Sequence, residues 1–487
     1  MTTEQQLPKG WKKTTFEDVA QVVSGGTPST KLETNFAEKG KGIGWITPAD
    51  LSKYTDKFIS NGARDLSIDG YKSCSAKLLP AGTVLLSSRA PIGYVAIAQS
   101  ELSTNQGFKN FILSDDILSE YAYYYLKSIK STIESLGSGT TFLELSASNA
   151  KKIPIIYPTS KETQQAIVNK IESLFDEIDE GIGRLKIAAQ QIQQYRQSLL
   201  KNAFNGELTK EWRSKHADTL PSKNELLAQI QTAREQHHAQ QLADWQTAVS
   251  QWEQNGKVGK KPSKPSSLSS VNILSKDSEL PENWLLTEAE SICDFITKGT
   301  TPPKNELFMK SGEVPFLKVY NLTKNGKLDF TIEPTFVSKE THNNFLNRSK
   351  VYPNDILMNI VGPPLGKVSL VPDDYPEWNI NQAIVIYRSI FVHSKFLANY
   401  LLAEKTIKLM SSQAKTTAGQ HNLTLEICRN LPIPVCSLAE QTQIVAILES
   451  KLTACDQLAA ELAKQLKQAE LLKQAVLKAA FSGELRE

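Results

Sequence analysis

The chain contains residues of the types that often do chemistry, but their spacing matches no common catalytic or cofactor-binding motif. Gly362 to Ser369 is similar to a phosphate-binding loop. However, it is one residue short before Lys367, and valine rather than serine or threonine follows that lysine. A similar stretch, Arg89 to Tyr94, has no lysine. We therefore interpret both stretches as turns between strands.

The histidines, cysteines and acidic residues are also spaced without a ligand pattern. The six histidines form no H-E-x-x-H motif, and the five scattered cysteines form no C-x-x-C pair. Asp373, Asp374 and Glu377 lack the following lysine of a nuclease motif, and no Asn-Pro-Pro-aromatic segment of an amino-group methyltransferase occurs. The sequence therefore predicts a chain with no catalytic site, metal or cofactor of its own.

A long internal repeat is the strongest signal in the sequence. The segment at 203–208 (AFNGEL) recurs 277 residues later at 480–485 (AFSGEL). Other shared segments follow in the same order: Leu7-Pro8 with Trp11 and Leu280-Pro281 with Trp284, Pro91-Ile92-Gly93 and Pro364-Leu365-Gly366, Asn105-Gln106 and Asn381-Gln382. A period of this length indicates duplicated domains rather than a solenoid. Two similar modules suggest a ligand with two parts.

Each half begins with short β-type runs and continues with a helical patch, which predicts an α/β module. Residues 1–157 form the predicted first module and residues 279–435 the predicted second module. No apolar run reaches the roughly 18–20 residues of a membrane span, and the polar start is no signal peptide, so we expect a cytoplasmic protein. The net charge of +3 means that any DNA-binding surface needs local gathering of lysine and arginine.

A heptad helix is predicted after each module, at residues 158–208 and 436–487, and proline-rich segments precede both. The main apolar positions are Ile171, Ile178, Leu185, Ile192 and Leu199 in the first helix, and Leu448, Cys455, Leu462, Ala469 and Val476 in the second. The predicted intervening series contains Leu174, Gly181, Ala188 and Tyr195, then Leu458 and Leu472. Such repeats favour an antiparallel coiled coil within the chain, although ordinary domain core remains the alternative.

Residues 209–278 have no counterpart in the second half. They begin as a polar helical stretch and end in a basic segment rich in proline and serine. We interpret the segment as a solvated tether, with phosphate contact as the alternative.

Taken in order, the shared motifs resemble the specificity subunit of a Type I DNA restriction-modification system. They are the Leu-Pro-x-x-Trp start, the Gly-Thr-Pro-like loops at 25–28 and 299–302, the heptad helix and the Ala-Phe-x-Gly-Glu-Leu end. The resemblance implies two target-recognition domains for the halves of a split double-stranded DNA target, and an antiparallel coil that sets the spacer. It also implies two modification subunits docked on the helices and two restriction subunits, which use S-adenosylmethionine, ATP and magnesium, and no membrane partner.

If the two modules recognise different half-sites, base-contacting residues should lie where their equivalent loops differ. Arginine can bind guanine with two hydrogen bonds, asparagine and glutamine can bind adenine, and lysine and threonine more often contact phosphate. The resulting DNA-binding candidates are Lys31, Arg89, Lys109, Thr140 and Thr141 in the first module, and Lys318, Lys415, Gln420, His421 and Asn422 in the second. The shared Asn105-Gln106 and Asn381-Gln382 pairs are interpreted as turn residues, with base contact as the alternative.

Two other classes of function stay open at the level of sequence. One is an autonomous methyltransferase or nuclease with divergent motifs, which turnover by the chain alone would reveal. The other is a scaffold of duplicated protein-binding modules, which would lack the steep salt dependence of DNA binding.

Overall fold

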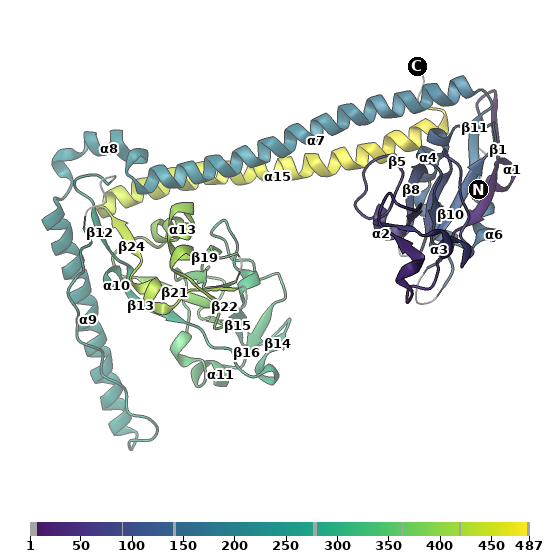
Figure 1. The fold of residues 1–487 in the computed structure, drawn as a ribbon. Coiled ribbons are helices and arrows are strands. Elements are labelled where there is room, and N and C mark those ends of the chain that lie inside the picture. Colours follow the sequence, from purple (N-terminus) through teal and green to yellow (C-terminus); the bar gives the residue numbers. More distant parts are fainter. Residues whose placement is uncertain are drawn as a thin grey trace. The chain divides into compact units, whose positions relative to one another are not determined.

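The computed structural model describes residues 7–89, 91–139, 143–275, 280–362, 364–417 and 420–484. They form two compact units (Figure 1). Unit 1 contains residues 1–188 and 461–487, and unit 2 contains residues 189–460. Each unit therefore holds one module together with part of each long helix.

In the first module a five-stranded sheet has the order β2-β10-β7-β8-β5. Its strands are β2 (Ala20–Ser24), β10 (Phe108–Leu113), β7 (Val84–Ser88), β8 (Ile92–Ala98) and β5 (Phe58–Ile59). A four-stranded sheet of β3 (Phe36–Ala37), β6 (Arg64–Leu66), β4 (Ile43–Ile46) and β9 (Ser103–Thr104) lies in the same module, as does the pair β1 (Trp11–Thr15) and β11 (Pro154–Pro158). The helices are α1 (Phe16–Val19), α2 (Pro48–Leu51), α3 (Ile68–Lys72), α4 (Ser119–Ser128), α5 (Lys130–Ser135) and α6 (Ala147–Lys151).

The second module repeats this plan. Its main sheet has the order β13 (Cys293–Lys298), β21 (Ile384–Ser389), β17 (Ile356–Asn359) and β19 (Val368–Leu370). The smaller sheets are β14 (Phe308–Met309), β16 (Thr335–Val337), β15 (Val314–Leu317) and β20 (Asn379–Ile380); β18 (Val361–Gly362), β23 (Gln420–Asn422) and β22 (Lys415–Thr417); and β12 (Leu285–Glu288) with β24 (Pro432–Val435). The helices are α10 (Ala289–Ile292), α11 (Lys339–Asn343), α12 (Ser394–Leu402), α13 (Glu404–Gln413) and α14 (Leu425–Arg429). The predicted pair of α/β modules is confirmed.

The central strand β7 shows why the main sheet forms. All five of its residues are buried, and its apolar residues Val84, Leu85 and Leu86 are consecutive rather than alternating with polar ones. Val84 and Leu86 belong to the core shared with α4, whereas Leu85 belongs to a separate core on the other face. The continuous apolar run in the sequence therefore corresponds to a strand covered on both sides.

The two long helices, α7 (Lys161–Phe204) and α15 (Leu438–Ser482), pack antiparallel, as predicted (Figure 1). In unit 1 Asp179 of α7 bonds to Lys473 of α15, and in unit 2 Arg196 of α7 pairs with Asp456 of α15. As the residue number increases along α7, from Asp179 to Arg196, the number of its partner on α15 decreases, from Lys473 to Asp456. This order is expected for antiparallel helices.

The intervening series of the predicted heptads is confirmed in part: Leu174, Gly181 and Ala188 are half-buried, whereas its other members are exposed. Tyr195, Leu458 and Leu472 are 48%, 57% and 51% exposed. Half-buried apolar residues also lie four residues after the main series, namely Phe175, Ile182, Leu452, Ala459 and Leu466. Spacings of three and of four residues both fit a heptad repeat. The sequence therefore does not say which residues face the partner helix, and the packing of the two helices determines it.

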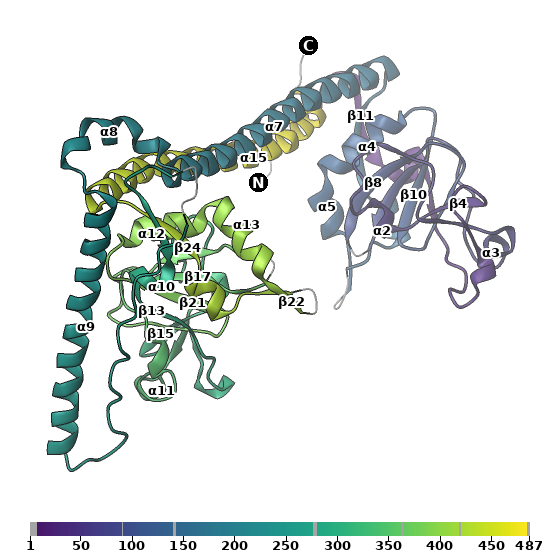
Figure 2. The same ribbon diagram turned by 60° about the vertical axis from the view of Figure 1, so that its left-hand side comes forward.

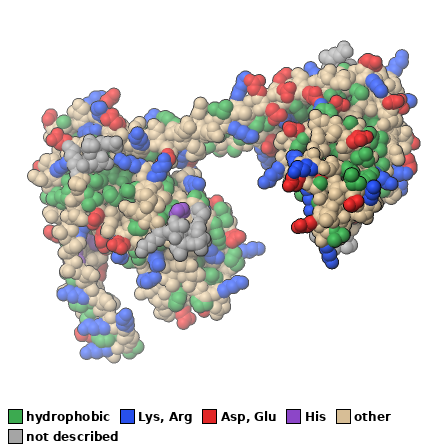
Figure 3. Space-filling view, viewed as in Figure 1, with side chains coloured by type: hydrophobic (Ala, Val, Ile, Leu, Met, Phe, Trp, Pro, Cys, Tyr) green, Lys and Arg blue, Asp and Glu red, His purple; other side chains and the backbone are tan. Residues whose placement is uncertain are grey.

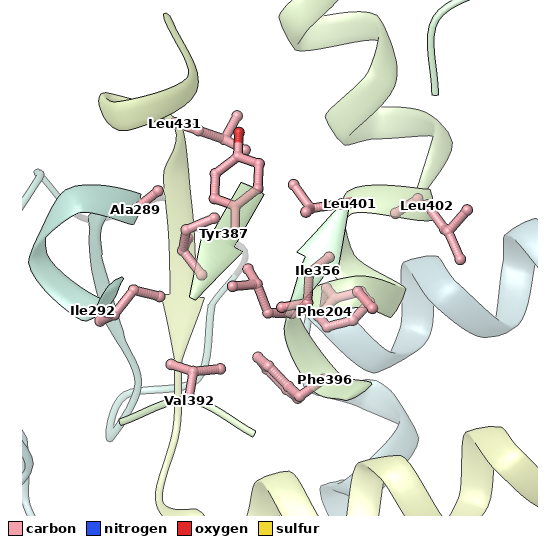
Figure 4. Close-up of a cluster of buried hydrophobic side chains, with 14 of the residues drawn as sticks. Phe204, Ala289, Ile292, Ile356, Tyr387, Val392, Phe396, Leu401, Leu402 and Leu431 are labelled. Carbon is pink, nitrogen blue, oxygen red and sulfur yellow. The ribbon is translucent and has the colours of Figure 1, made fainter. Parts of the chain in front are cut away.

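Each long helix begins on one module and ends in the core of the other. The last turns of α15 place Leu477, Ala480 and Phe481 in the first module's core, where the Phe481 ring contacts Tyr121 and Tyr125 edge-on. The end of α7 likewise inserts Phe204 into the second module's core, edge-on to Phe396 and Tyr400 (Figure 4).

The starts of the helices are fixed by two equivalent buried glutamines. Gln164 donates to the carbonyls of Asp116 and Pro158, and its side-chain oxygen accepts from the Leu118 amide. Gln441, 277 residues later, donates to the Cys436 carbonyl and accepts from the His393 amide. Because a buried amide is costly to leave unpaired, these bonds hold each helix to its module in one orientation.

Residues 209–275 contain the predicted helix, but its first turns pack on the second module and the predicted tether lies against it. They contain α8 (Lys210–Lys215) and α9 (Lys223–Gln254), and α9 buries Leu226, Ile230 and Arg234 against the second module. The segment after α9 then returns alongside that helix instead of extending freely (Figures 1 and 2). Within the described residues, no helix combines the length and the apolar character that crossing a membrane requires.

Candidate nucleic-acid interface

Both modules have a short hairpin beside the end of a central strand. In the second module β22 pairs with β23, and β23 pairs with β18, so that His421 lies opposite Gly362 and Asn422 opposite Val361. In the first module Glu144 pairs with both Arg89 and Ser138 through isolated bridges. The equivalent loops that differ in sequence are thus brought to the same place in each module.

A second shared feature joins the Gly-Thr loop to the Asn-Gln turn. The Thr27 hydroxyl donates to the side-chain oxygen of Gln106, and Thr301 donates to Gln382 in the same way. Both glutamines are exposed. The glycines before these threonines are packed tightly, because a Cβ on Gly25 or Gly299 would overlap the carbonyl of the turn.

The interpretation of the Asn-Gln pairs as turn residues is confirmed for their asparagines. The Asn105 side-chain oxygen accepts from the Gly107 amide, and that of Asn381 accepts from the Ala383 amide. Such bonds from asparagine to the backbone two residues later stabilise turns.

The hairpin and the Thr–Gln pair are adjacent in each module. The Ser88 amide donates to the Gly107 carbonyl at 2.7 Å, and the Ile360 amide donates to the Ala383 carbonyl at 2.8 Å. Ser88 precedes Arg89, and Gly107 follows Gln106. We name this place, where the central strand meets the turn, the reading edge of each module.

The first module's reading edge is basic and incompletely paired. Arg89 contacts Glu144 at 3.4 Å, and both side chains are substantially exposed. The Arg89 Nε and the buried Ser88 hydroxyl find no hydrogen-bond partner among the described residues. Lys109 lies nearby, only 5% exposed, and burial lowers the pKa of its ammonium group. Two cations therefore lie near a single carboxylate, which pairs with Arg89 alone, and this arrangement suits a ligand that offers acceptor atoms.

The second module's reading edge carries different chemistry. By their backbone hydrogen bonds, the residues equivalent to Ser88 and Arg89 are Ile360 and Val361, and Asn422 lies opposite Val361 as Glu144 lies opposite Arg89. Lys318 lies next to the turn, because the carbonyl of the preceding Leu317 accepts from the Asn381 amide at 3.0 Å. The Lys318 ammonium lies 5.8 Å from the Tyr320 ring. The two edges thus share a backbone plan and differ in side chains.

Most of the predicted DNA-binding residues lie at the reading edge or in the hairpin of their own module, with exceptions. Arg89, Lys109, His421 and Asn422 lie at the reading edges, and Lys415 and Gln420 belong to the hairpin by their backbone pairing. Lys31 is exposed on the loop that follows Pro28, outside the hairpin. Thr140 and Thr141 lie outside the described residues.

Sequence reasoning missed the threonines of the Gly-Thr loops. The repeat contained the signal, because Thr27 and Thr301 recur in the same motif, but the motif gave no indication of their partners. Those partners are 79 and 81 residues away in the sequence.

The predicted docking residues of the long helices are mostly buried at the ends and half-buried between them. Ile171, Leu199 and Leu448 are buried in the module cores. The remaining members are half-buried, namely Ile178, Leu185, Ile192, Leu462 and Val476. Across the described ranges, no group of three or more histidine, cysteine, aspartate or glutamate residues could hold a metal ion.

Comparison with known proteins identifies related chains. The family model described as Type I restriction modification DNA specificity domain matches residues 8–185 and 281–468. The chain is 30% identical over 321 residues to the Type I restriction enzyme MjaIX specificity subunit of Methanocaldococcus jannaschii, a match that covers 66% of this chain and 60% of that protein. It is 24% identical over 380 residues to the Type I restriction enzyme EcoBI specificity subunit of Escherichia coli, covering 77% of this chain and 67% of the relative.

A solved structure has a similar fold. A chain from a structural study of complex assembly and conformational transition of the type I R-M system matches with a TM-score of 0.65 at 16% identity. The match covers 99% of this chain and 100% of the other.

Proposed function

The chain belongs to the family of Type I restriction modification DNA specificity domains, and on this premise we propose that it is the specificity subunit of a Type I restriction-modification complex. In this role it binds double-stranded DNA with a split target, and each module recognises one half-site through its reading edge. The observation that carries the proposal is the repetition of one backbone plan with different side chains at the two reading edges.

Arg89 is our candidate for direct base recognition. In the free protein its guanidinium contacts Glu144 at a long 3.4 Å, and its Nε has no described partner. A guanine edge offers two acceptors, O6 and N7, which suit the arginine fork better than one distant carboxylate oxygen. We propose that a guanine base replaces Glu144 as the partner of Arg89. At bases that lack this pair of acceptors, Arg89 remains paired with Glu144.

The Thr–Gln pairs are proposed to contact the DNA backbone. Thr27 and Thr301 hold the oxygens of Gln106 and Gln382, so the exposed amide nitrogens remain available as donors. Since the pair is identical in modules that recognise different half-sites, it suits a group common to all DNA, namely phosphate.

The catalytic steps are proposed to belong to partner subunits. Two modification subunits, which use S-adenosylmethionine, dock on α7 and α15, and two restriction subunits use ATP and magnesium. The long helices support this role because most of their length outside the module cores has exposed polar faces. The chain acts in the cytoplasm, together with its DNA.

The proposal is tested by expressing the chain with its modification subunits and mapping the methylated adenines in host DNA. We expect one split motif with a spacer of fixed length. A continuous motif would contradict the proposal, and so would methylation or cleavage by the purified chain alone with S-adenosylmethionine, ATP and magnesium.

The role of Arg89 is tested separately with Arg89→Gln. Loss of a two-bond contact to guanine costs about 1–3 kcal/mol, so affinity for the target should fall roughly tenfold to a hundredfold and specificity should relax at one base pair. Arg184→Gln is the matched control, because Arg184 also pairs with a glutamate, Glu180, but on the exposed face of α7. An equal loss in both variants would refute a specific role for Arg89.

A further inference from the structure

The segment between the two halves forms an ordered projection, which we name the arm (residues 241–270). The Trp245 indole donates to the Pro262 carbonyl at 3.1 Å, and the Trp252 indole donates to the Gly259 carbonyl at 3.2 Å. Gly256, Lys257 and Gly259 have positive φ, which forms a tight turn after α9. The returning segment is therefore hydrogen-bonded to α9 at two places.

The base of the arm is fixed to the second module. The Arg234 guanidinium donates to the carbonyls of Ser291 and Ser269 at 2.7 and 2.9 Å, and Gln241 donates to Asp294. Between residues 249 and 264, the hydrogen bonds given for the described residues stay within the arm. The outer part, residues 249–264, is the arm tip, which projects from the second module (Figure 2).

The arm tip is strongly basic. It carries Lys257, Lys260, Lys261 and Lys264, all exposed, and the sequence has no acidic residue between Glu253 and Asp277. Within the described parts of the chain, no carboxylate forms an ion pair with these lysines, while the Lys264 ammonium lies 5.8 Å from the Trp245 ring. Lysine and arginine side chains gather at this end of α9 in the space-filling view (Figure 3).

We propose that the arm tip is an additional DNA-binding surface that contacts phosphates without regard to sequence. This inference rests on the proposed function, because it adds contacts outside the reading edges. Duplex DNA carries one negative charge per roughly 1.7 Å of its axis, so a group of flexible lysines can neutralise several phosphates without a defined fit.

The composition of the arm tip favours DNA over a protein partner. Protein interfaces depend on aromatic, apolar and arginine anchors and are depleted in lysine. Here both tryptophan N–H groups are already used inside the arm, and Val258, at 79% exposure, is the one mostly exposed large apolar side chain of the tip. A surface with exposed lysines and few apolar contact residues suits a polyanion such as DNA.

The experiment compares the full-length chain with the triple variant Lys257→Gln, Lys260→Gln and Lys261→Gln. Affinity for a duplex containing the target and for a random duplex is measured over a series of salt concentrations. Each lost phosphate contact reduces the slope of log K against log salt by about 0.9. We expect the slope to decrease by about 2–3, and affinity at low salt to fall about tenfold or more on both duplexes alike.

A matched triple variant controls for net charge. Lys186→Gln, Lys451→Gln and Lys467→Gln removes three exposed lysines of the long helices that have no ion pair among the described residues. This control should keep a slope close to that of the wild type. An equal decrease in both triple variants would overturn the inference, because it would reflect total charge alone.

Two further outcomes are informative. If the arm variant keeps the wild-type slope but loses affinity for the other subunits of the complex, the arm binds protein and the inference is wrong. If the wild-type chain itself shows no salt-dependent binding to DNA, the proposed function fails first, and this result is distinct from a failure confined to the arm.

Discussion

Lys109 shows how a single residue can link stability to binding. It lies in β10, is almost fully buried, and has the Arg89 charge nearby as well as Glu144. Burial is the largest cause of its lowered pKa, because a charged ammonium loses its hydration there. A buried ammonium that has lost its hydration weakens the fold, so we infer that the contribution of Lys109 is to DNA binding.

Replacing this residue with a similar apolar side chain should therefore stabilise the fold. We expect Lys109→Met to raise the free energy of unfolding of unit 1 by about 1 kcal/mol, since replacing buried charges by apolar groups is often stabilising. The same change should reduce affinity for target DNA. Denaturant unfolding and a binding assay would measure the two effects.

The pH dependence gives an independent check. Because the pKa of Lys109 is lowered in the folded state, the cost of its charge is present at neutral pH and disappears as pH rises toward 10.5, the ordinary lysine value. The stability advantage of the methionine variant should shrink over that rise. Lys31→Met, at an exposed position, should change stability by less than about 0.5 kcal/mol at any pH.

At the scale of elements, the two long helices are held at both ends. Gln164 and Gln441 fix their starts, and Phe481 and Phe204 fix their ends inside the module cores. Between these ends the pair is kept in register by contacts such as Asp179 with Lys473 and Arg196 with Asp456. Residues added to both helices should therefore lengthen the helix pair between these fixed ends.

Matched insertions in both helices should change the DNA spacer. A second copy of residues 182–188 in α7 and of residues 457–463 in α15 preserves the heptads and adds about 10.5 Å. At about 3.4 Å per base pair, the preferred spacer should lengthen by about three base pairs, while both half-sites stay the same. Binding to duplexes that differ only in spacer length would measure this.

The arm provides the control for these insertions. Seven residues added between Gly256 and Gly259 should leave the preferred spacer unaltered. An unchanged spacer after the helix insertions would show that the helices do not set the distance.

At the scale of the whole molecule, the C-terminal end of the chain completes the N-terminal module. Leu477, Ala480 and Phe481 belong to the same core as Tyr121 of α4, although more than 350 residues separate them in sequence. The first module thus depends on the last residues of α15, and the second module depends on the last residues of α7.

A truncation tests this dependence. Ending the chain after Gln474 should destabilise the first module by about 5 kcal/mol or more, because losses of a buried leucine and a buried phenylalanine each cost several kcal/mol. Amide hydrogen exchange should become faster in α4, while α12 of the second module keeps its protection. A chain that ends after Glu484 should exchange like the full-length protein; faster exchange confined to the second module would contradict the assignment.

Features that depend on local pattern could be predicted from the amino-acid sequence. The repeat predicted two α/β modules, the spacing of Ile171, Ile178 and Leu185 predicted the helix pair, and the turn at Asn105-Gln106 followed from the residue types. These inferences hold because periodicity and turn chemistry are properties of neighbouring residues.

Contacts between distant segments could not be predicted in this way, and the folded structure revealed them. It placed Lys473 of α15 over the Phe175 ring of α7, joined Thr27 to Gln106, buried Lys109 and folded the basic segment back against Trp245. Each of these outcomes depends on which surfaces meet when the chain packs. Residues with the same local pattern can satisfy several such pairings, and the whole packed chain selects one.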